Sequence, residues 1–310
     1  MSKSELPIGY TWQYCRTAGY EIAACIKYSM ADLYDPDKGW IETDDVLVEV
    51  IRATDWKAPG QVWRFNPYDK DSLLSDFAGM EMSNDSILEF INKYGLFYDI
   101  NDEGFASSQL EEYNGRPLKS GEFTKKGTLY RFHSADDLKN LRNEISKAKA
   151  AIRILDIINH DNEDIIVRRI NGTYSIGRLD SQAVALIFPD LGRIIARVGN
   201  AVEGYSKNEQ IDISYQFVRH LISKHTQDNG VTLTLLPYQT TSSSAVKLQP
   251  FITPRNLMGV IWHLIANEAS SAYGLRRCEE CGTWFRFMKQ NARTCGPTCR
   301  KRISRKAQAV

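Results

Sequence analysis

The spacing of four cysteines near the C-terminal end of the chain constrains its folding most strongly. They form a Cys-x2-Cys pair, a gap of thirteen residues and a Cys-x3-Cys pair, and they are Cys278, Cys281, Cys295 and Cys299. Where a compartment keeps thiols reduced, such pairs are typical of metal ligands and not of disulfides. Four tetrahedral thiolates suit zinc, so we expect one structural Zn²⁺ per chain. The alternative, four unrelated buried cysteines, is disfavoured by this spacing.

The residues around the cysteines predict the local fold. Gly282 follows the first pair, where a knuckle must turn tightly, and residues 283–287 are typical of the short strand that leaves such a knuckle. Pro297 suits the first turn of a helix, and Cys295 and Cys299 are four residues apart, so their side chains lie on one helix face. Knuckle, strand pair and ligand-bearing helix together predict a treble-clef-like zinc finger.

Two segments of this region, residues 277–285 and 294–302, resemble the C-terminal CGNR-type zinc fingers of bacterial proteins. The Asn-Arg signature of that family is replaced here, because Arg300 follows the final Cys299. The resemblance implies zinc binding, and it implies nucleic-acid binding of the kind attributed to those fingers in transcriptional regulators. Residues 74–78 and 87–96 are similar to segments of uncharacterised bacterial proteins that bear such a finger.

Charge is distributed unevenly along the chain. Residues 276–310 carry ten Lys or Arg and two acidic residues, a net charge of +8. Since the whole chain is at +1, the first 275 residues carry −7. A basic segment attached to an acidic body favours a polyanionic partner, DNA or RNA. The alternative is a solvated basic end that rests on the protein's own acidic body.

A helix from about Pro297 to Gln308 would turn Cys299 and Ile303 toward the metal and expose its basic residues. Such a helix can lie in a major groove or along a phosphate backbone. The expected contacts are Arg286, Lys289, Arg293, Arg300, Lys301, Arg302, Arg305 and Lys306. The rings of Trp284, Phe285 and Phe287 could stack on unpaired bases, but packing within the small finger is the favoured alternative.

Composition and motifs set the remaining bounds. The 310 residues are 43% hydrophobic and 11% aromatic, which is typical of a packed globular protein. No basic leader and no apolar run of about 18 residues is present, so we expect a cytoplasmic protein without membrane contact. The chain also lacks the Walker, dinucleotide-binding and Gly-x-Ser-x-Gly motifs, and no catalytic residue is assigned.

Hydrophobic periodicity predicts several elements before the finger. Ser83 and Gly95 bound a helix over residues 83–95. A longer helix covers residues 134–159, and its stripe repeats with heptad spacing, either as a core face or as a seam between two copies of the chain. Residues 165–170 and 173–179 predict a β-hairpin, because Asn171-Gly172 suits a type I′ turn.

Further elements complete the expected body. Strands are expected at residues 45–53, 61–65 and 231–235, and helices at 191–203 and 209–226. A polar loop over residues 239–244 precedes a buried helix over residues 253–274, which Thr253 caps and which runs directly into the finger. The finger should therefore be rigidly mounted.

These features predict an α+β fold, with a predominantly helical body, small β elements and the C-terminal finger. We expect an N-terminal α+β region over residues 1–130, a mainly helical region over 131–275 and the finger over 276–310. The leading hypothesis is a regulatory nucleic-acid-binding protein whose acidic body recognises a ligand or partner. The alternatives are a protein-interaction or assembly module, homodimers included, with a purely structural zinc site, and an enzyme that acts on nucleic acid through unidentified carboxylates.

Overall fold

The computed structural model describes residues 72–97, 135–159, 163–179, 183–197, 207–239, 246–270, 274–287 and 292–308, together with short segments before residue 68 and between residues 112 and 117. The chain divides into two compact units, one of residues 9–67 and 83–143, and one of residues 1–8, 68–82 and 144–310. We call them the sheet unit and the helical unit. None of the described helices combines the length and apolarity that crossing a bilayer requires.

The described residues of the sheet unit form small antiparallel sheets, one complete helix and the beginning of a second, longer helix. Its largest sheet has the order β2-β5-β9. Its strands are β1 Trp12–Cys15, β2 Tyr20–Lys27, β3 Tyr34–Asp35, β4 Gly39–Trp40, β5 Val46–Ala53, β6 Val62–Phe65, β7 Glu112–Tyr113, β8 Arg116–Pro117 and β9 Ala135–Asp137. The strands predicted at residues 45–53 and 61–65 are confirmed as β5 and β6.

Helix α2, Asn84–Tyr94, confirms the helix predicted over residues 83–95. The Ser83 side chain accepts a hydrogen bond from the Ser86 amide, and Gly95 ends the helix with a positive φ of 90°. The amide of Tyr20 in β2 donates to Asn92 Oδ1 at 3.0 Å, which fastens the helix to the sheet.

The long helix α4 spans Leu138–Ile158, and it confirms most of the helix predicted over residues 134–159. The first residues of that prediction instead form β9, which pairs with β5. The heptad stripe is buried within a single chain, so it serves as a core face and not as a seam between two copies. Its buried members are Leu138, Leu141, Ile145, Ala148, Ile152 and Leu155.

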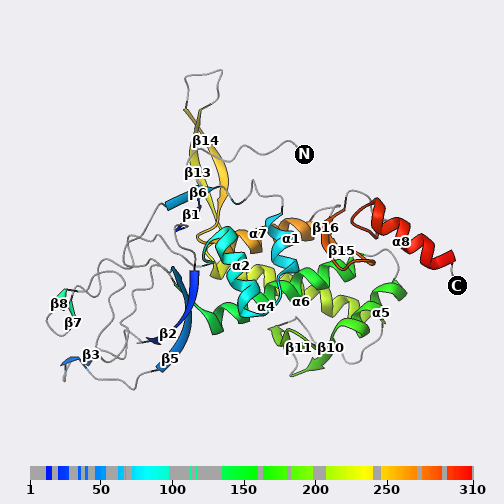
Figure 1. Cartoon of the computed structure of the whole chain (residues 1–310), viewed down its shortest axis with the longest axis horizontal. Coiled ribbons are helices and arrows are strands. Elements are labelled where there is room, and N and C mark those ends of the chain that lie inside the picture. The colour runs from blue at the N-terminus through cyan, green and yellow to red at the C-terminus, as the bar shows by residue number, and fades with distance from the viewer. Residues whose placement is uncertain are drawn as a thin grey trace. The chain divides into compact units, whose positions relative to one another are not determined.

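The remaining elements before the finger belong to the helical unit (Figure 1). They are α1 Leu73–Gly79, α5 Glu163–Thr173, β10 Ser175–Arg178, β11 Ala183–Phe188, β12 Gly192–Arg197, α6 Lys207–Asp228, β13 Thr232–Gln239, β14 Val246–Thr253 and α7 Leu257–Ser270. Helix α6 packs against α5 and α7. It confirms the helix predicted over residues 209–226, and β13 confirms the predicted strand at 231–235.

The predicted hairpin at residues 165–179 is wrong in its first strand and its turn, which are helix α5, whereas its second strand is confirmed in part as β10. Ile166 and Ile170 are four residues apart and both buried, which is a helical spacing. Gly172 lies in the last turn of α5, and the positive φ values that a type I′ turn requires are absent there. The Asn171-Gly172 pair misled the prediction, because here it lies inside the last turn of a helix.

The predicted helix over residues 191–203 is also wrong, because its first part is strand β12 in the sheet β10-β11-β12. Ile194 and Ala196 are buried while Ile195 is exposed, which is the alternation of a strand. Gly192, with a φ of 77°, makes the turn from β11. Residues 198–203 lie outside the described part of the chain.

The buried helix predicted over residues 253–274 is confirmed as α7, but with different ends. Strand β14 continues through Thr253, and the cap is Asn256, whose Oδ1 accepts from the Gly259 amide at 2.7 Å. The helix ends at Ser270. In the polar loop predicted over residues 239–244, Gln239 belongs to β13, and residues 240–244 lie outside the described part of the chain.

A polar network is enclosed by the apolar core of the helical unit. Trp262 of α7 is fully buried, and its Nε1 donates to Glu144 Oε1 at 2.9 Å. His225 of α6 approaches the same oxygen through Nδ1 at 2.7 Å and stacks on the Trp262 ring. Asn229 Nδ2 lies 3.4 Å from it. This carboxylate therefore links α4, α6 and α7.

Candidate metal centre

The first cysteine pair lies on a knuckle between two short strands, β15 Leu275–Arg277 and β16 Trp284–Arg286. The Cys278 amide donates to the Thr283 carbonyl, and the Gly282 amide donates to the Cys278 carbonyl, both at 2.9 Å. Gly282 has a φ of 72°, a backbone conformation that side chains disfavour. This turn brings Cys278 and Cys281 to the same side of the knuckle.

The second pair lies at the start of helix α8, Pro297–Gln308. Proline at the first position of a helix needs no donor there, and the Arg300 amide donates to the Gly296 carbonyl at 3.1 Å in the first turn. Cys295 precedes the helix and Cys299 lies within its first turn, so both sulfurs face the knuckle. We call β15, β16 and α8, with the residues between them, the finger.

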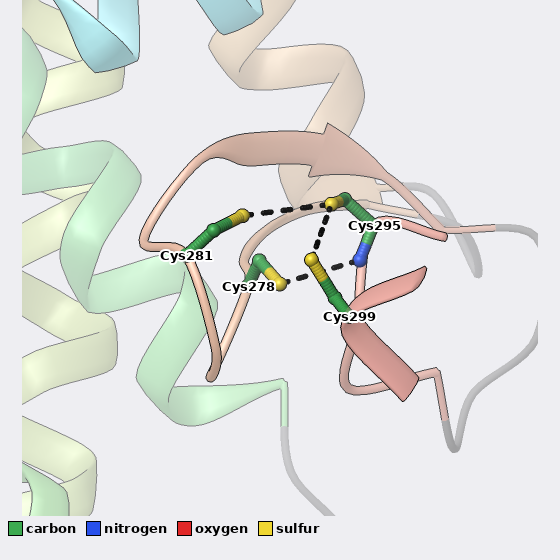
Figure 2. Close-up of side chains that lie close together, drawn as sticks. All are labelled: Cys278, Cys281, Cys295 and Cys299. Carbon is green, nitrogen blue, oxygen red and sulfur yellow. Dashed lines mark hydrogen bonds between the residues drawn. The ribbon is translucent and has the colours of Figure 1, made fainter. Parts of the chain in front are cut away.

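The four sulfur atoms converge (Figure 2). All four lie within 4.8 Å of one another, and the Cys295 sulfur is 3.6 Å from the sulfurs of both Cys281 and Cys299. A tetrahedron with metal–sulfur bonds of about 2.3 Å has sulfur–sulfur edges of about 3.8 Å. The cluster is therefore close to the geometry that a four-coordinate metal ion would impose.

Hydrogen bonding separates the pKa values of these thiols. Interaction with the Thr283 hydroxyl lowers the pKa of Cys281 to about 6, whereas proton sharing with Cys281 and Cys299 raises the pKa of Cys295 to about 12. Burial opposes ionisation of Cys278, but the amides of Cys281, Cys295 and Glu280 outweigh it and lower the Cys278 pKa. A divalent cation would take the place of the shared protons.

These cysteines are the one group of three or more metal-binding side chains within the described part of the chain. Cys278 and Cys299 are buried, and Cys281 and Cys295 are exposed. Four protein ligands fill a tetrahedral coordination shell and leave no position for water or substrate. Chemically, the arrangement suits a structural metal ion that ties α8 to the knuckle.

Two arginines of the finger form ion pairs with buried carboxylates of the helices. Arg286 pairs with Glu268 of α7, and Arg276 Nε lies 3.8 Å from Asp156 Oδ1 of α4. Burial raises the pKa of both carboxyl groups, although Arg286 and Arg169 respectively oppose that shift. The Arg276 guanidinium also lies over the Phe287 ring at 4.4 Å. The finger is therefore joined to α4 and α7 by charged side chains.

The residues predicted to contact nucleic acid differ in their surroundings. On α8, Arg300, Lys301, Arg302, Arg305 and Lys306 are all exposed. Lys306 pairs with Glu280 at 2.9 Å, Arg286 pairs with Glu268, and Arg293 lies 3.9 Å from Glu279. Lys289 lies outside the described residues. Within the described part of the chain, the four arginines and lysines at 300, 301, 302 and 305 make no ion pair.

The aromatic residues of the finger divide between packing and exposure. Phe287 is buried, as expected for packing, whereas Trp284 and Phe285 are half-buried. Sequence analysis missed a group of polar residues beside Trp284, which includes Lys149 of α4. Lys149 is 4% exposed and lies among buried alanines, so a lysine within an apolar helix face was the available signal.

Comparison with known proteins adds no assignment. No protein-family model matches the chain, and neither a curated protein nor a solved structure is significantly similar to it. The CGNR-type resemblance is therefore not confirmed by a family match, and what is established at this site is a four-cysteine cluster able to hold a metal ion.

Proposed function

We propose that the protein is a zinc-finger nucleic-acid-binding protein of the cytoplasm, with a regulatory role in which the acidic body recognises a ligand or partner. One observation carries this proposal. Helix α8 presents four exposed cations that have no ion pair within the described part of the chain, while its Cys299 faces the sulfur cluster. The ion would hold the helix, and the exposed side chains would meet phosphates.

Zinc is the metal that this donor set favours. Thiolates are soft ligands, and tetrahedral four-sulfur sites are typical of zinc and of iron–sulfur proteins. Zinc has no redox chemistry. This agrees with a site in which four protein ligands fill the coordination shell and leave no position for a substrate. One Zn²⁺ per chain would be held by Cys278, Cys281, Cys295 and Cys299.

The ion pairs of the finger reduce the number of basic residues that are available for nucleic-acid contacts. Lys306, Arg286 and Arg293 each have an acidic neighbour, so binding through them would require breaking an existing pair. Lys301, Arg302 and Arg305 share one side of α8, and Arg300 extends the basic surface around the helix. Figure 1 draws α8 in red as a helix that projects beyond β15 and β16.

The test compares two variants of the full zinc-loaded chain. In the first, Arg300, Lys301, Arg302 and Arg305 become Gln. In the matched control, four exposed basic residues of the body, Arg168, Arg193, Arg219 and Lys224, become Gln, so both variants lose four positive charges. Fluorescence anisotropy with random-sequence duplex DNA and single-stranded RNA measures affinity at several salt concentrations.

We expect a logarithmic salt slope of about −4 for duplex DNA, because four phosphate contacts release the corresponding counterions. The α8 variant should lose at least about a hundredfold in affinity at low salt, while the control loses much less and both keep their zinc. Absence of binding to DNA and RNA at low salt by the intact protein would overturn the proposal.

A second candidate, an interaction or assembly module with a purely structural zinc site, is favoured by the Lys306–Glu280 pair. This contact uses a cation of α8 to brace the helix against the knuckle. Under this candidate the four substitutions on α8 would change stability or partner binding, and there would be no nucleic-acid affinity to lose.

A further inference from the structure

A pocket of about 380 Å³ lies where the finger meets α1 and α4 within the helical unit. Its walls include the backbone after α1, two basic residues of α4, Asp190 from the turn between β11 and β12, and the strands of the finger. This volume is within the range of small-molecule sites. The residues that matter for its chemistry are Met80, Lys149, Arg153, Asp190, Arg277 and Trp284.

Of the two basic residues of α4 in the pocket, one is paired with a carboxylate and the other is bonded only to neutral groups. Arg153 and Asp190 form a two-point ion pair, with both nitrogen–oxygen distances at 2.6 Å, and so neutralise each other. Lys149 donates to the carbonyl of Ala78 at 2.8 Å and to those of Phe77 and Met80. Those acceptors are neutral, so they satisfy the donors of the Lys149 ammonium group without cancelling its charge.

Arg277 adds a second cation at the finger side. Its Nε donates to the Gly282 carbonyl at 3.1 Å, which orients the guanidinium group. The terminal nitrogens have no hydrogen bond or ion pair with the described residues. Three cations and two carboxylates, Glu81 and Asp190, line the pocket, so the balance favours an anionic ligand.

The pocket also offers an aromatic ring on which a planar group of a ligand could stack. Arg277 and Trp284 are direct partners in the register of β15 and β16, so their side chains lie next to each other on one face of the hairpin. Trp284 is half-buried and lines the pocket, which leaves part of the indole accessible. A guanidinium group beside an accessible indole suits a phosphate beside an aromatic ring.

We propose that this pocket binds one nucleotide, with its base against Trp284 and its phosphate at Arg277. The nucleotide is either free or an unpaired unit of a nucleic-acid strand, since both present the same chemistry. The site uses none of the α8 residues that carry the proposed nucleic-acid contacts, so it goes beyond that function. Arg277 directly precedes Cys278 and Gly282 directly follows Cys281, so a nucleotide bound in this pocket would lie beside the metal knuckle.

The experiment titrates the full zinc-loaded chain with adenosine 5′-monophosphate, adenosine, inorganic phosphate and a short single-stranded oligonucleotide, by calorimetry and tryptophan fluorescence. We expect the nucleotide to bind more tightly than adenosine or phosphate alone. Arg277→Gln and Trp284→Leu should each weaken it by about tenfold or more, because stacking and charge contacts of this kind contribute at that level.

Gly79→Ile tests the site without altering either contact residue. A Cβ atom at Gly79 would lie 3.9 Å from Trp284 Cδ1, an ordinary contact, so the larger side chain extends into the pocket. It should abolish nucleotide binding while zinc content stays unchanged. Arg193→Gln, an exposed substitution elsewhere, should bind as the parent protein does.

The titrations and variants distinguish a free nucleotide from an unpaired nucleotide of a nucleic-acid strand. Binding of the free nucleotide that survives the four Gln substitutions on α8 supports a small-molecule site, whatever becomes of the nucleic-acid proposal. Binding of the oligonucleotide alone, weakened by Arg277→Gln and by Gly79→Ile, supports an unpaired unit of a strand. If neither binds at millimolar concentration, or if the three pocket variants bind like the parent, the proposal is wrong.

Discussion

The finger and the core around α4, α6 and α7 hold their shapes by different means. The core buries large apolar side chains, among them Trp262 and Phe217, and encloses one carboxylate with several donors. The described finger buries few apolar residues and gathers four sulfurs and many cations. Burial stabilises the first region, whereas the second buries little apolar area, so we expect it to need a bound ion to stay ordered.

Metal removal should give the largest effect and separates the two regions most sharply. Chelation, or Cys295→Ser, should remove one zinc per chain, and the finger should lose its order because structural zinc supplies about 10–16 kcal/mol of apparent binding energy. The body should keep most of its helical circular dichroism. Metal analysis and hydrogen exchange measure the two responses.

Cys15→Ser is the control for metal removal, because Cys15 belongs to neither of the two cysteine pairs and has no partner at metal-ligand spacing in the sequence. It should retain the full metal content. Freshly purified protein without bound metal, or exchange protection lost equally from finger and core, would contradict the division between the regions.

Trp262→Ala should give the next largest effect, now on the core. The substitution removes a fully buried ring and the donor that it offers to Glu144, at a cost of about 3–5 kcal/mol in the free energy of unfolding. Phe285→Ala is the matched change in the finger, where the ring is half-buried, and it should cost less. Urea unfolding measures both; equal losses would show that the finger depends on burial as the core does.

The smallest expected effect is a dependence of the free energy of unfolding on pH, which arises from Glu144 in the core. Burial opposes its ionisation, but the contacts with His225, Lys147 and Trp262 outweigh burial and hold its pKa below the usual 4.5. The unfolded chain therefore binds the proton more readily. Stability from this group is present above pH 4.5 and is lost as pH falls through the folded-state pKa.

Glu144→Gln tests this pH dependence. It should cost about 1–3 kcal/mol at neutral pH, because buried donors lose a charged acceptor, and it should flatten the fall in stability on the acid side. Thermal unfolding between pH 3 and pH 7 measures the curve. A fall of unchanged steepness in the variant would assign the acid sensitivity to other carboxyl groups.

Local chemistry made some elements predictable from the sequence. Ser83 and Gly95 fixed the ends of α2, and the cysteine spacing indicated the knuckle and the start of α8, because caps and ligand spacings act over a few residues. The errors at α5 and β12 arose where β-branched residues suit both helix and strand. There the outcome depends on packing partners distant in sequence, such as β11 beside β12.

The pocket and the ion pairs could not be predicted for the same reason. Lys149 meets the carbonyls of Phe77, Ala78 and Met80 across about seventy residues of chain, a contact that no local propensity encodes. Asp156 and Arg276 are likewise distant in sequence. The sequence shows that these charged residues are present, but it does not show which groups they contact in the fold.

The arginine anchors of the finger have a consequence for dissecting the protein into parts. A chain that stops at residue 274 would retain Glu268, which is 6% exposed, without the guanidinium group of Arg286. Asp156 would lose the more distant Arg276 but keep its ion pair with Arg169 of α5. A buried carboxylate that loses its cation destabilises a fold by about 3–5 kcal/mol. Truncation is therefore not a neutral deletion, whereas Glu268→Gln introduced with the truncation should recover much of the stability that is lost with Arg286.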